Sequence, residues 1–446
     1  MSKKEEVLQS LKENNIKYVR FLYVDNDNVI RGYMGNAKSM DKDLDSGFSV
    51  SKAMPFFTAF DHLIPDTNFS YFGELRIVPD LDTFRILPYA ERTAAVICDF
   101  KTVDLKPSNV CARTKLKEIL KQSEYEVYVG IENEFYFLTK DAEGKYIPAD
   151  SCLCFATTGM NQWNELVLEL TEVLEEQGIE VEKYYPEYGP GQQEIVFKCD
   201  KALKTADNQI IFRETVRAIG NKYGVTPCFM PKPFNNLAGS GAHLNISLWK
   251  DGKNVFFAKE DKFGLSQKAY HFIGGILKHI RQICAFTAST ITSYKRLIPH
   301  SWASAFGCYG MDNREAAIRI PSTQYSNEEK TARIEFKPID PACNPYLALA
   351  AVIAAGLDGI HNKLDPGKPL EVDPGYLSKE ERESLGIKPF PRNLFEALQE
   401  LDKSEFFRNL FGNEMVDEYI KMKMHDWNEY MLHVTDWERE RYVDIF

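Results

Sequence analysis

The segment 128–138 constrains the fold most strongly, because it is rich in β-branched and aromatic residues and is typical of a strand. Alternate side chains of a strand share a face, so Glu132 and Glu134 project to one side while Ile131 and Phe135 project to the other. Two neighbouring carboxylates repel one another inside a protein unless cations lie beside them. This segment alone is equally compatible with a solvated sheet face and with a metal site.

Three further predicted strands, at 192–198, 241–249 and 332–337, each have one apolar and one polar face. A solvated face would carry mixed Lys, Thr and Gln side chains. These faces carry glutamates and one histidine, and this composition favours a site. Glu187 joins them from across a tight turn at 189–191. The resulting set contains five glutamates and one histidine: Glu132, Glu134, Glu187, Glu194, Glu335 and His243. Such an oxygen-rich set suits Mg²⁺ or Mn²⁺ better than zinc, and its charge implies more than one ion.

A basic cluster follows the predicted strand at 241–249 in the sequence. It contains Lys295, Arg296, Arg314, Arg319, Lys330 and Arg333. Divalent ions beside arginines are the arrangement used for phosphoryl transfer, where guanidinium groups hold the charge that develops on the phosphate. The sequence has no GxxxxGK[ST] pattern, so a P-loop enzyme is excluded.

Composition limits the class of protein. A chain of 446 residues suits two or three domains, and a net charge of −11 disfavours nucleic acid or an anionic membrane as the main partner. No apolar run is long enough to span a membrane, and the first residues lack a secretory signal. Nine scattered cysteines without a CxxC pair predict free thiols in a reducing cytoplasm.

The first hundred residues are predicted to form a separate unit with a short helix at 5–13 and a hairpin joining 18–24 to 29–33. Strands are expected at 75–78, 83–87 and 93–100. The stretch 46–73 is predicted to be irregular, and its seven aromatic residues are expected to pack against another subunit. A boundary near residue 106 then divides the chain into domains at 1–106 and 107–446. In the second domain, strands alternate with amphipathic helices whose apolar stripes predict ordinary core packing.

These motifs resemble the glutamine synthetase family, and the resemblance covers nearly the whole chain. The matching motifs are the ENE strand at 132–134, the pair Glu187 and Glu194 around GPGQ, the segments 229–233 and 239–243, SYKRL at 293–297, residues 313–321, and 340–346. The resemblance implies an α+β fold with an N-terminal β-grasp domain and a catalytic domain whose curved antiparallel sheet is backed by helices. It also implies homo-oligomers of stacked rings, commonly dodecamers, with active sites between neighbouring subunits. The family phosphorylates the γ-carboxylate of glutamate with ATP, and a nitrogen nucleophile then displaces phosphate.

The resemblance also assigns roles to individual residues. Glu132, His243 and Glu335 match the ligands of the metal that bridges the nucleotide phosphates, and Glu134, Glu187 and Glu194 match those of the other metal. Arg296 matches the clamp on the glutamate α-carboxylate, beside Gly239. The residues matched to phosphate and nucleotide contacts or to catalysis are Arg314, Arg319, Arg333, Lys337, Ser247, Asn245 and Lys330.

The nitrogen side departs from the ammonia-using members of the family. They carry an acid six positions after the arginine of SYKRL, where this chain has Trp302, and an Asp in the loop donated by the neighbouring subunit, where Ser49 is the nearest match. The Asn before GSG is replaced by Ala238, and Lys337 replaces an arginine, which keeps the charge but loses the bidentate fork. Ala238 and the aromatic Trp302 both resemble the γ-glutamylpolyamine branch.

These departures predict a pocket that does not bind NH₄⁺ well, in which the indole holds an alkylammonium by a cation–π contact or packs against its alkyl chain. The expected function is an ATP- and Mg²⁺-dependent ligase that joins glutamate to an amine other than ammonia. Two alternatives stay open at this point. One is a glutamine synthetase with unusual pocket residues, and the other is a catalytically inactive scaffold, which the complete set of ligand carboxylates argues against.

Overall fold

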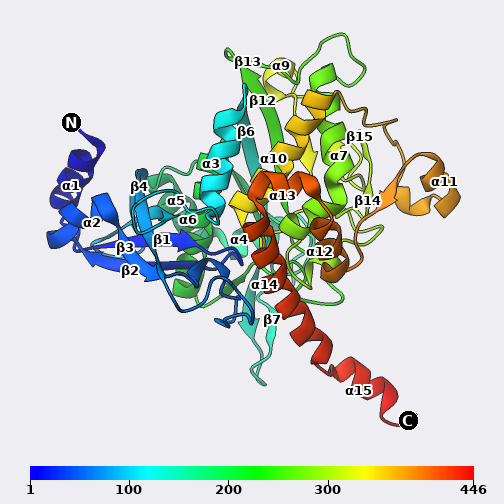
Figure 1. Ribbon diagram of the computed structural model, residues 1–446. Coiled ribbons are helices and arrows are strands. Elements are labelled where there is room, and N and C mark those ends of the chain that lie inside the picture. Colours follow the sequence, from blue (N-terminus) through cyan, green and yellow to red (C-terminus); the bar gives the residue numbers. More distant parts are fainter.

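The computed structural model describes all residues from 1 to 446, and its N-terminal part is a five-stranded sheet with short helices (Figure 1). The strand order is β2-β1-β5-β4-β3, with β1 and β5 parallel and the other neighbours antiparallel. The elements are α1 Lys3–Glu13, β1 Tyr18–Val24, β2 Ile30–Asn36, η1 Ala37–Ser39, α2 Met40–Ser46, β3 Phe48–Ser51, η2 Met54–Phe56, β4 Glu74–Ile86 and β5 Thr93–Lys101. A central parallel pair in a mixed sheet is the arrangement expected of a β-grasp fold.

The second sheet has eleven strands and curves until it is nearly barrel-like. Its main path is β15-β16-β17-β12-β6-β9-β8, in which only the β15–β16 pair is parallel. Its strands are β6 Glu126–Lys140, β7 Tyr146–Pro148, β8 Val181–Pro186, β9 Gln192–Phe197, β10 Asp200–Lys201, β11 Thr226–Cys228, β12 Ala242–Lys250, β13 Lys253–Asn254, β15 Tyr309–Met311, β16 Ile318–Ile320 and β17 Ile334–Phe336. A separate pair joins β14 Phe306–Gly307 to β18 Lys388–Pro389.

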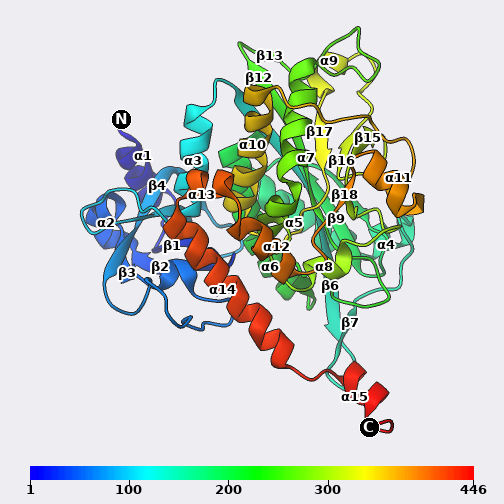
Figure 2. The same cartoon turned by 45° about the vertical axis from the view of Figure 1, so that its right-hand side comes forward.

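Helices back the apolar face of this sheet, and α7 and α10 pack against each other (Figures 1 and 2). The helices are α3 Ala112–Gln122, α4 Thr157–Gln162, α5 Asn164–Glu176, α6 Ala202–Lys222, α7 Gln267–Thr287, α8 Ser293–Arg296, α9 Glu328–Thr331, α10 Pro345–Asn362, η3 Pro374–Tyr376, α11 Lys379–Ser384, α12 Leu394–Asp402, α13 Glu405–Phe411, α14 Asn413–Leu432 and α15 Asp436–Tyr442. The helix α10 begins after Asn344, whose side chain accepts hydrogen bonds from the backbone N–H of Tyr346 and Leu347, and Pro345 sets its first turn. No helix is long and apolar enough to cross a membrane.

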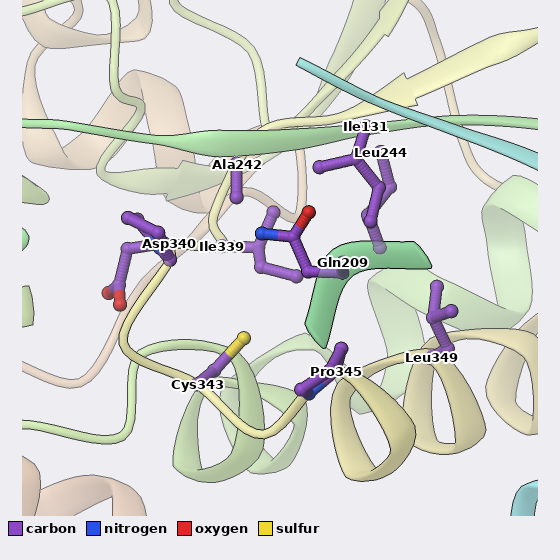
Figure 3. Close-up of a pocket in the computed structure, with 10 residues that line it drawn as sticks. Ile131, Gln209, Ala242, Leu244, Ile339, Asp340, Cys343, Pro345 and Leu349 are labelled. Atoms are coloured by element: carbon purple, nitrogen blue, oxygen red, sulfur yellow. The ribbon is translucent and has the colours of Figure 1, made fainter. Parts of the chain in front are cut away.

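The apolar face of the sheet and the helices enclose a small cavity (Figure 3). Ile131 and Leu244 line it. Because neighbouring residues on a strand face opposite sides, Glu132 and His243 point away from this cavity. The cavity is therefore a packing space within the core and lies behind the polar face.

An ion-pair network joins two strands of the small sheet to the helices α3 and α6. Arg113 on α3 contacts Asp80 on β4 and Asp99 on β5 at 2.9 and 3.0 Å, and it donates to Asp207 on α6 at 2.8 Å. Lys117, one turn further along α3, lies 2.9 Å from Asp80. The network fixes the small sheet against the helices of the larger part, and the boundary predicted at residue 106 stays a prediction.

The structure differs from the sequence expectations in two places. The strands expected at 75–78 and 83–87 form one strand, β4, because a register shift between Asp80 and Arg85 accommodates the intervening residues. The stretch 46–73 is not wholly irregular, since it contains β3 and η2. Its Phe56 and Phe69 are buried within the same chain, whereas Phe60, Tyr71 and Phe72 are exposed.

Candidate active site

The predicted metal-binding side chains lie on four neighbouring strands of the large sheet. Antiparallel pairing places Glu132 of β6 opposite His243 of β12, and Glu134 opposite Glu194 of β9. Glu335 lies on β17, the next strand beyond β12. Glu187 follows β8, and its backbone N–H pairs with Gln192 at the start of β9. Sheet pairing therefore brings together residues that are up to 203 positions apart in the sequence, from 132 to 335.

His243 is the centre of this group. Its Nδ1 lies 3.6 Å from Glu132, 3.7 Å from Glu134 and 3.6 Å from Glu335. Glu132, His243 and Glu335 each direct one ligand atom to within 4.8 Å of the others. On the other side of Glu134, the carboxylate of Glu194 accepts a hydrogen bond from the Tyr185 hydroxyl.

Crowding of buried carboxylates shifts their proton affinities in opposite directions. Burial and the charge of Glu134 raise the pKa of Glu187 to about 7, and burial with Glu134 and Glu132 raises the pKa of Glu194. Burial also opposes ionisation of Glu132, but His243 outweighs it and lowers the pKa of Glu132 to about 2. Buried carboxylates this close together repel one another unless cations lie beside them. Hard oxygen ligands with one imidazole fit Mg²⁺ or Mn²⁺.

Basic side chains adjoin the carboxylates along β16 and β17. The Arg319 guanidinium donates to Glu335 at 2.8 Å, and Lys337 donates to the same carboxylate at 3.3 Å. Arg333 donates to Asn245 at 2.8 Å, and Asn245 donates to Glu132 at 3.0 Å. Arg319, Lys337 and the Arg333–Asn245 pair thus border the acidic group on one side.

Arg296 is buried against His243, with its guanidinium 3.0 Å from Nε2 of that ring. Two glycines make room for it: a Cβ on Gly239 would lie 2.7 Å from Arg296 Cγ, and a Cβ on Gly241 would lie 2.5 Å from its guanidinium nitrogen. A side chain at either position would displace the arginine. The glycines of the GSG segment therefore allow the Arg296 guanidinium to reach the metal side of the sheet.

Trp302 lies in the loop between α8 and β14, and its side chain is 64% exposed. The Arg314 guanidinium carbon lies 5.7 Å from the indole centre. The backbone N–H of Trp302 donates to the carboxylate of Glu315 at 2.7 Å. Glu315 is buried, and burial raises its pKa. The apolar character of the nitrogen pocket stays a prediction, and the structure adds a buried carboxylate beside the Trp302 backbone.

Four other predicted residues lie on different elements and make contacts of their own. Ser49 lies on β3 in the small sheet, where its hydroxyl accepts from Arg76, away from β12 and β17 (Figure 2). Lys330 lies in the last turn of the exposed helix α9, and the Ser247 hydroxyl accepts from the Trp249 indole at 3.0 Å. The carbonyl of Ala238 accepts from the Tyr136 hydroxyl at 2.7 Å, beside the GSG segment.

Sequence reasoning missed three side chains that contact the site. Glu315 holds the Trp302 loop, Tyr185 contacts Glu194, and Gln192 donates to Glu134 at 3.3 Å. Gln192 has a signal in the sequence, since it directly follows GPG on the strand that carries Glu194. Glu315 has none, because its contact with Trp302 depends on how two loops pack.

Comparison with known proteins decides the family. Residues 107–442 match the family model of the glutamine synthetase catalytic domain, and residues 4–110 match that of the glutamine synthetase N-terminal domain. The chain belongs to the glutamine synthetase family. Glutamine synthetase from Methanosarcina mazei is 35% identical over 451 residues, covering 99% of this chain and 98% of that protein. Glutamine synthetase from Methanocaldococcus jannaschii is 35% identical over 456 residues, covering 98% of each.

Solved structures of the family superpose closely. A complex of GmaS, a γ-glutamylmethylamide synthetase, with ADP has a TM-score of 0.87 at 27% identity, covering 98% of this chain and 99% of that one. A structure described as a novel glutamine synthase homologue has a TM-score of 0.84 at 26% identity, covering 97% of this chain and 99% of that one. Members of the family use ATP and a divalent metal ion. This glutamine synthetase family member is thus an ATP-dependent carbon–nitrogen ligase with an α+β fold.

Proposed function

We propose that this ligase activates the γ-carboxylate of glutamate as γ-glutamyl phosphate and transfers the γ-glutamyl group to an organic amine. The observation that carries the proposal is Trp302, which stands where ammonia-using relatives have an acid and exposes its indole beside Arg314. The fold similarity to GmaS, a γ-glutamylmethylamide synthetase, supports the same branch.

The six acidic and imidazole side chains are proposed to hold the divalent metal ions. Glu132, His243 and Glu335 would form one set of ligands, and Glu134, Glu187 and Glu194 the other. Bound Mg²⁺ or Mn²⁺ supplies Lewis-acid polarisation of the nucleotide phosphates. Burial and neighbouring carboxylates raise the pKa values of Glu187 and Glu194, so bound cations would favour the ionised form of both side chains.

The basic residues are proposed to orient the two substrates. Arg296 binds the α-carboxylate of glutamate, and Arg314, Arg319 and Arg333 bind phosphate and nucleotide, with Ser247, Asn245 and Lys330 beside them. A γ-carboxylate oxygen bonds to the γ-phosphorus as the bond from that phosphorus to the bridging oxygen of ADP breaks. Arg319 and Lys337 then lie where cations can hold the charge on the transferred phosphoryl group.

The second step explains the importance of Trp302. The amine nitrogen bonds to the acyl carbon, the bond from that carbon to the phosphate oxygen breaks, and the nitrogen loses a proton. A carbon chain on the amine gains apolar contact with the indole, worth about 0.8 kcal/mol per buried CH₂ group. Two or three such groups give a preference of roughly tenfold or more over ammonia.

Glutamine synthesis from ammonia is the second candidate function, because the relatives at about 35% identity carry that name and because Glu315 places a carboxylate beside Trp302. A charged carboxylate attracts ammonium and alkylammonium alike. Selectivity for an organic amine then depends on the indole and not on the lack of charge in the pocket.

A panel of nitrogen nucleophiles tests the proposed function. Phosphate release from ATP and glutamate is measured with ammonium, methylamine, ethanolamine, isopropylamine, putrescine and spermidine at matched concentrations. At least one organic amine is expected to give the highest kcat/KM. If ammonium equals or exceeds every amine, the chain is a glutamine synthetase.

We further propose that the protein forms rings of identical subunits with active sites between neighbours. Phe60, Tyr71 and Phe72 of the loop 57–73 expose their aromatic side chains, which supports a contact with another subunit. The same arrangement would bring Ser49 of one subunit to the active site of the next subunit. Within its own chain, Ser49 lies away from the active-site strands.

A further inference from the structure

A group of metal-ligand side chains lies outside the active site, where the loop 57–73 meets α14. It consists of His62 from the loop and His425 and Glu429 from the helix. Each directs one ligand atom to within 4.8 Å of the others. Nδ1 of His62 and Nε2 of His425 both lie 3.4 Å from Oε1 of Glu429.

These separations are too long for ordinary hydrogen bonds, whose N···O distances are about 2.7–3.2 Å. Nε2 of His425 is sealed from solvent and has no hydrogen-bond partner. Oδ1 of Asp426, the next residue, is also buried without a partner. Buried polar atoms normally have partners, so these two atoms indicate that something besides the protein satisfies this corner.

The separations match ligand atoms around one tetrahedral ion. Two ligands at about 2.0–2.1 Å from a tetrahedral Zn²⁺ lie about 3.3 Å apart. Ligands at right angles around a six-coordinate ion at the same distance lie only about 2.9–3.0 Å apart. The two separations of 3.4 Å are close to the tetrahedral spacing.

We propose that His62, His425 and Glu429 bind one zinc-like divalent ion, with the fourth position open to water. The donor set of two imidazoles and one carboxylate is suited to Zn²⁺, whereas the glutamate-rich active site is suited to Mg²⁺ or Mn²⁺. The two places therefore select different ions. The half-exposed side chains of His62 and Glu429 give the ion access from solvent.

The ion extends a row of contacts that already joins the loop to α14. Glu418 accepts from the Thr67 hydroxyl and from the backbone N–H of Asn68, and Lys421 donates to the Asp66 carbonyl at 2.9 Å. Residues 418, 421, 425 and 429 are spaced three or four apart, so they share one face of the helix. The zinc site is the last contact in this row, and it fixes the loop, which carries the exposed Phe60, against the C-terminal helix (Figures 1 and 2).

Co²⁺ spectroscopy tests the site directly, because tetrahedral Co²⁺ absorbs visible light far more strongly than six-coordinate Co²⁺. The full-length protein, purified without added histidines and stripped with a chelator, is titrated with Co²⁺ in excess Mg²⁺. One equivalent per chain is expected to develop the intense tetrahedral spectrum. Zn²⁺ should then remove the spectrum by displacing Co²⁺.

Variants assign the signal to these residues. His425→Ala and Glu429→Ala should each lower the affinity for Co²⁺ by roughly 100-fold or more. His433→Ala, an exposed histidine just beyond α14, is the matched control and should bind like the unmodified protein. Metal-free thermal melting of His425→Ala and of the unmodified protein should coincide, which shows that the variant is folded.

A second readout follows the loop. Zn²⁺ should slow chymotrypsin cleavage after the exposed Phe60, Tyr71 and Phe72 of the loop in the unmodified protein and in His433→Ala, but not in His425→Ala. A missing tetrahedral spectrum in the unmodified protein would overturn the proposal, and so would a spectrum unchanged in His425→Ala. Neither result depends on which nitrogen substrate the ligase uses.

Discussion

Trp302 contacts two neighbouring side chains, the carboxylate of Glu315 through its backbone and the Arg314 guanidinium through its indole. Trp302 has a positive φ of 56°, which is unusual for a residue with a side chain, and its N–H is held by the buried Glu315 carboxylate. The loop conformation that presents the indole therefore depends on Glu315. On the proposed function, the indole provides selectivity and the carboxylate holds it in place.

Replacing Trp302 tests the selectivity at this residue. Trp302→Glu should raise kcat/KM for ammonium relative to the best organic amine by roughly tenfold or more, because it removes apolar contact and adds an acid. Trp302→Phe is the matched control and should keep the preference for the organic amine. Steady-state kinetics with both nucleophiles give the ratio, and an unchanged ratio in Trp302→Glu would place Trp302 outside the nitrogen pocket.

Two substitutions at Glu315 separate its charge from its hydrogen bond. Glu315→Gln keeps an oxygen that can accept from the Trp302 N–H, whereas Glu315→Ala removes it. If Glu315 acts by holding the loop, Glu315→Ala should raise KM for the amine at least several-fold while Glu315→Gln stays close to the unmodified enzyme. An equal loss in both variants, measured by the same kinetics, would instead assign the effect to the charge.

At the scale of elements, the alternating pattern of the strands predicted most of the site. Glu132, Glu134, Glu194, His243 and Glu335 could be placed on one polar face because a strand has a period of two and its apolar residues must face the helices. The helices α5, α6 and α7 follow their predicted apolar stripes. Long-range loop contacts have no such period, so the contact between Glu315 and Trp302 and the continuous strand β4 could not be predicted.

The ion pairs between the small sheet and helix α3 should make the stability of the protein depend on pH. Burial would raise the pKa of Asp80, but the charges of Arg113 and Lys117 outweigh it and lower the pKa to about 2. A carboxyl whose pKa is lower in the folded state stabilises the fold above its unfolded pKa of about 3.8, and this contribution is lost as the pH falls toward 2.

Asp80→Asn should therefore lower the free energy of unfolding by roughly 1–2 kcal/mol at pH 7, allowing for partial solvent screening. Urea unfolding at a series of pH values should show that the difference from the unmodified protein shrinks between about pH 4 and pH 2. Asp82→Asn, two residues along β4 and exposed, is the control and should show little change at any pH. A pH-independent deficit in Asp80→Asn would mean that the network does not depend on the Asp80 charge.

At the scale of the whole molecule, the C-terminal segment stands apart from the body. Figure 2 shows α15 extending beyond the end of α14, and its neighbourhood exposes Leu432, Val434, Trp437 and Phe446. A projecting segment with exposed apolar side chains gains free energy by packing on another copy of the chain. On the proposed assembly, this segment and the exposed aromatics of the loop 57–73 would both contact neighbouring subunits.

Deleting residues 433–446 tests this account of assembly. The truncated protein should have a smaller mass in light scattering than the full chain, because the contacts of the segment are lost. The double replacement Tyr71→Ser with Phe72→Ser probes the second surface, the loop 57–73, because both side chains are exposed. A full-length chain that is monomeric and fully active would contradict the proposed assembly and the shared active sites.

The ligase is proposed to transfer the γ-glutamyl group to an organic amine in preference to ammonia. The most direct measurement is a competition in one reaction that contains ATP, glutamate, Mg²⁺, and equal concentrations of ammonium and of the best amine from the panel. Mass spectrometry then gives the ratio of γ-glutamyl amide to glutamine, which equals the ratio of the two kcat/KM values. The account predicts that the γ-glutamyl amide exceeds glutamine by roughly tenfold or more; equal amounts or an excess of glutamine would contradict it.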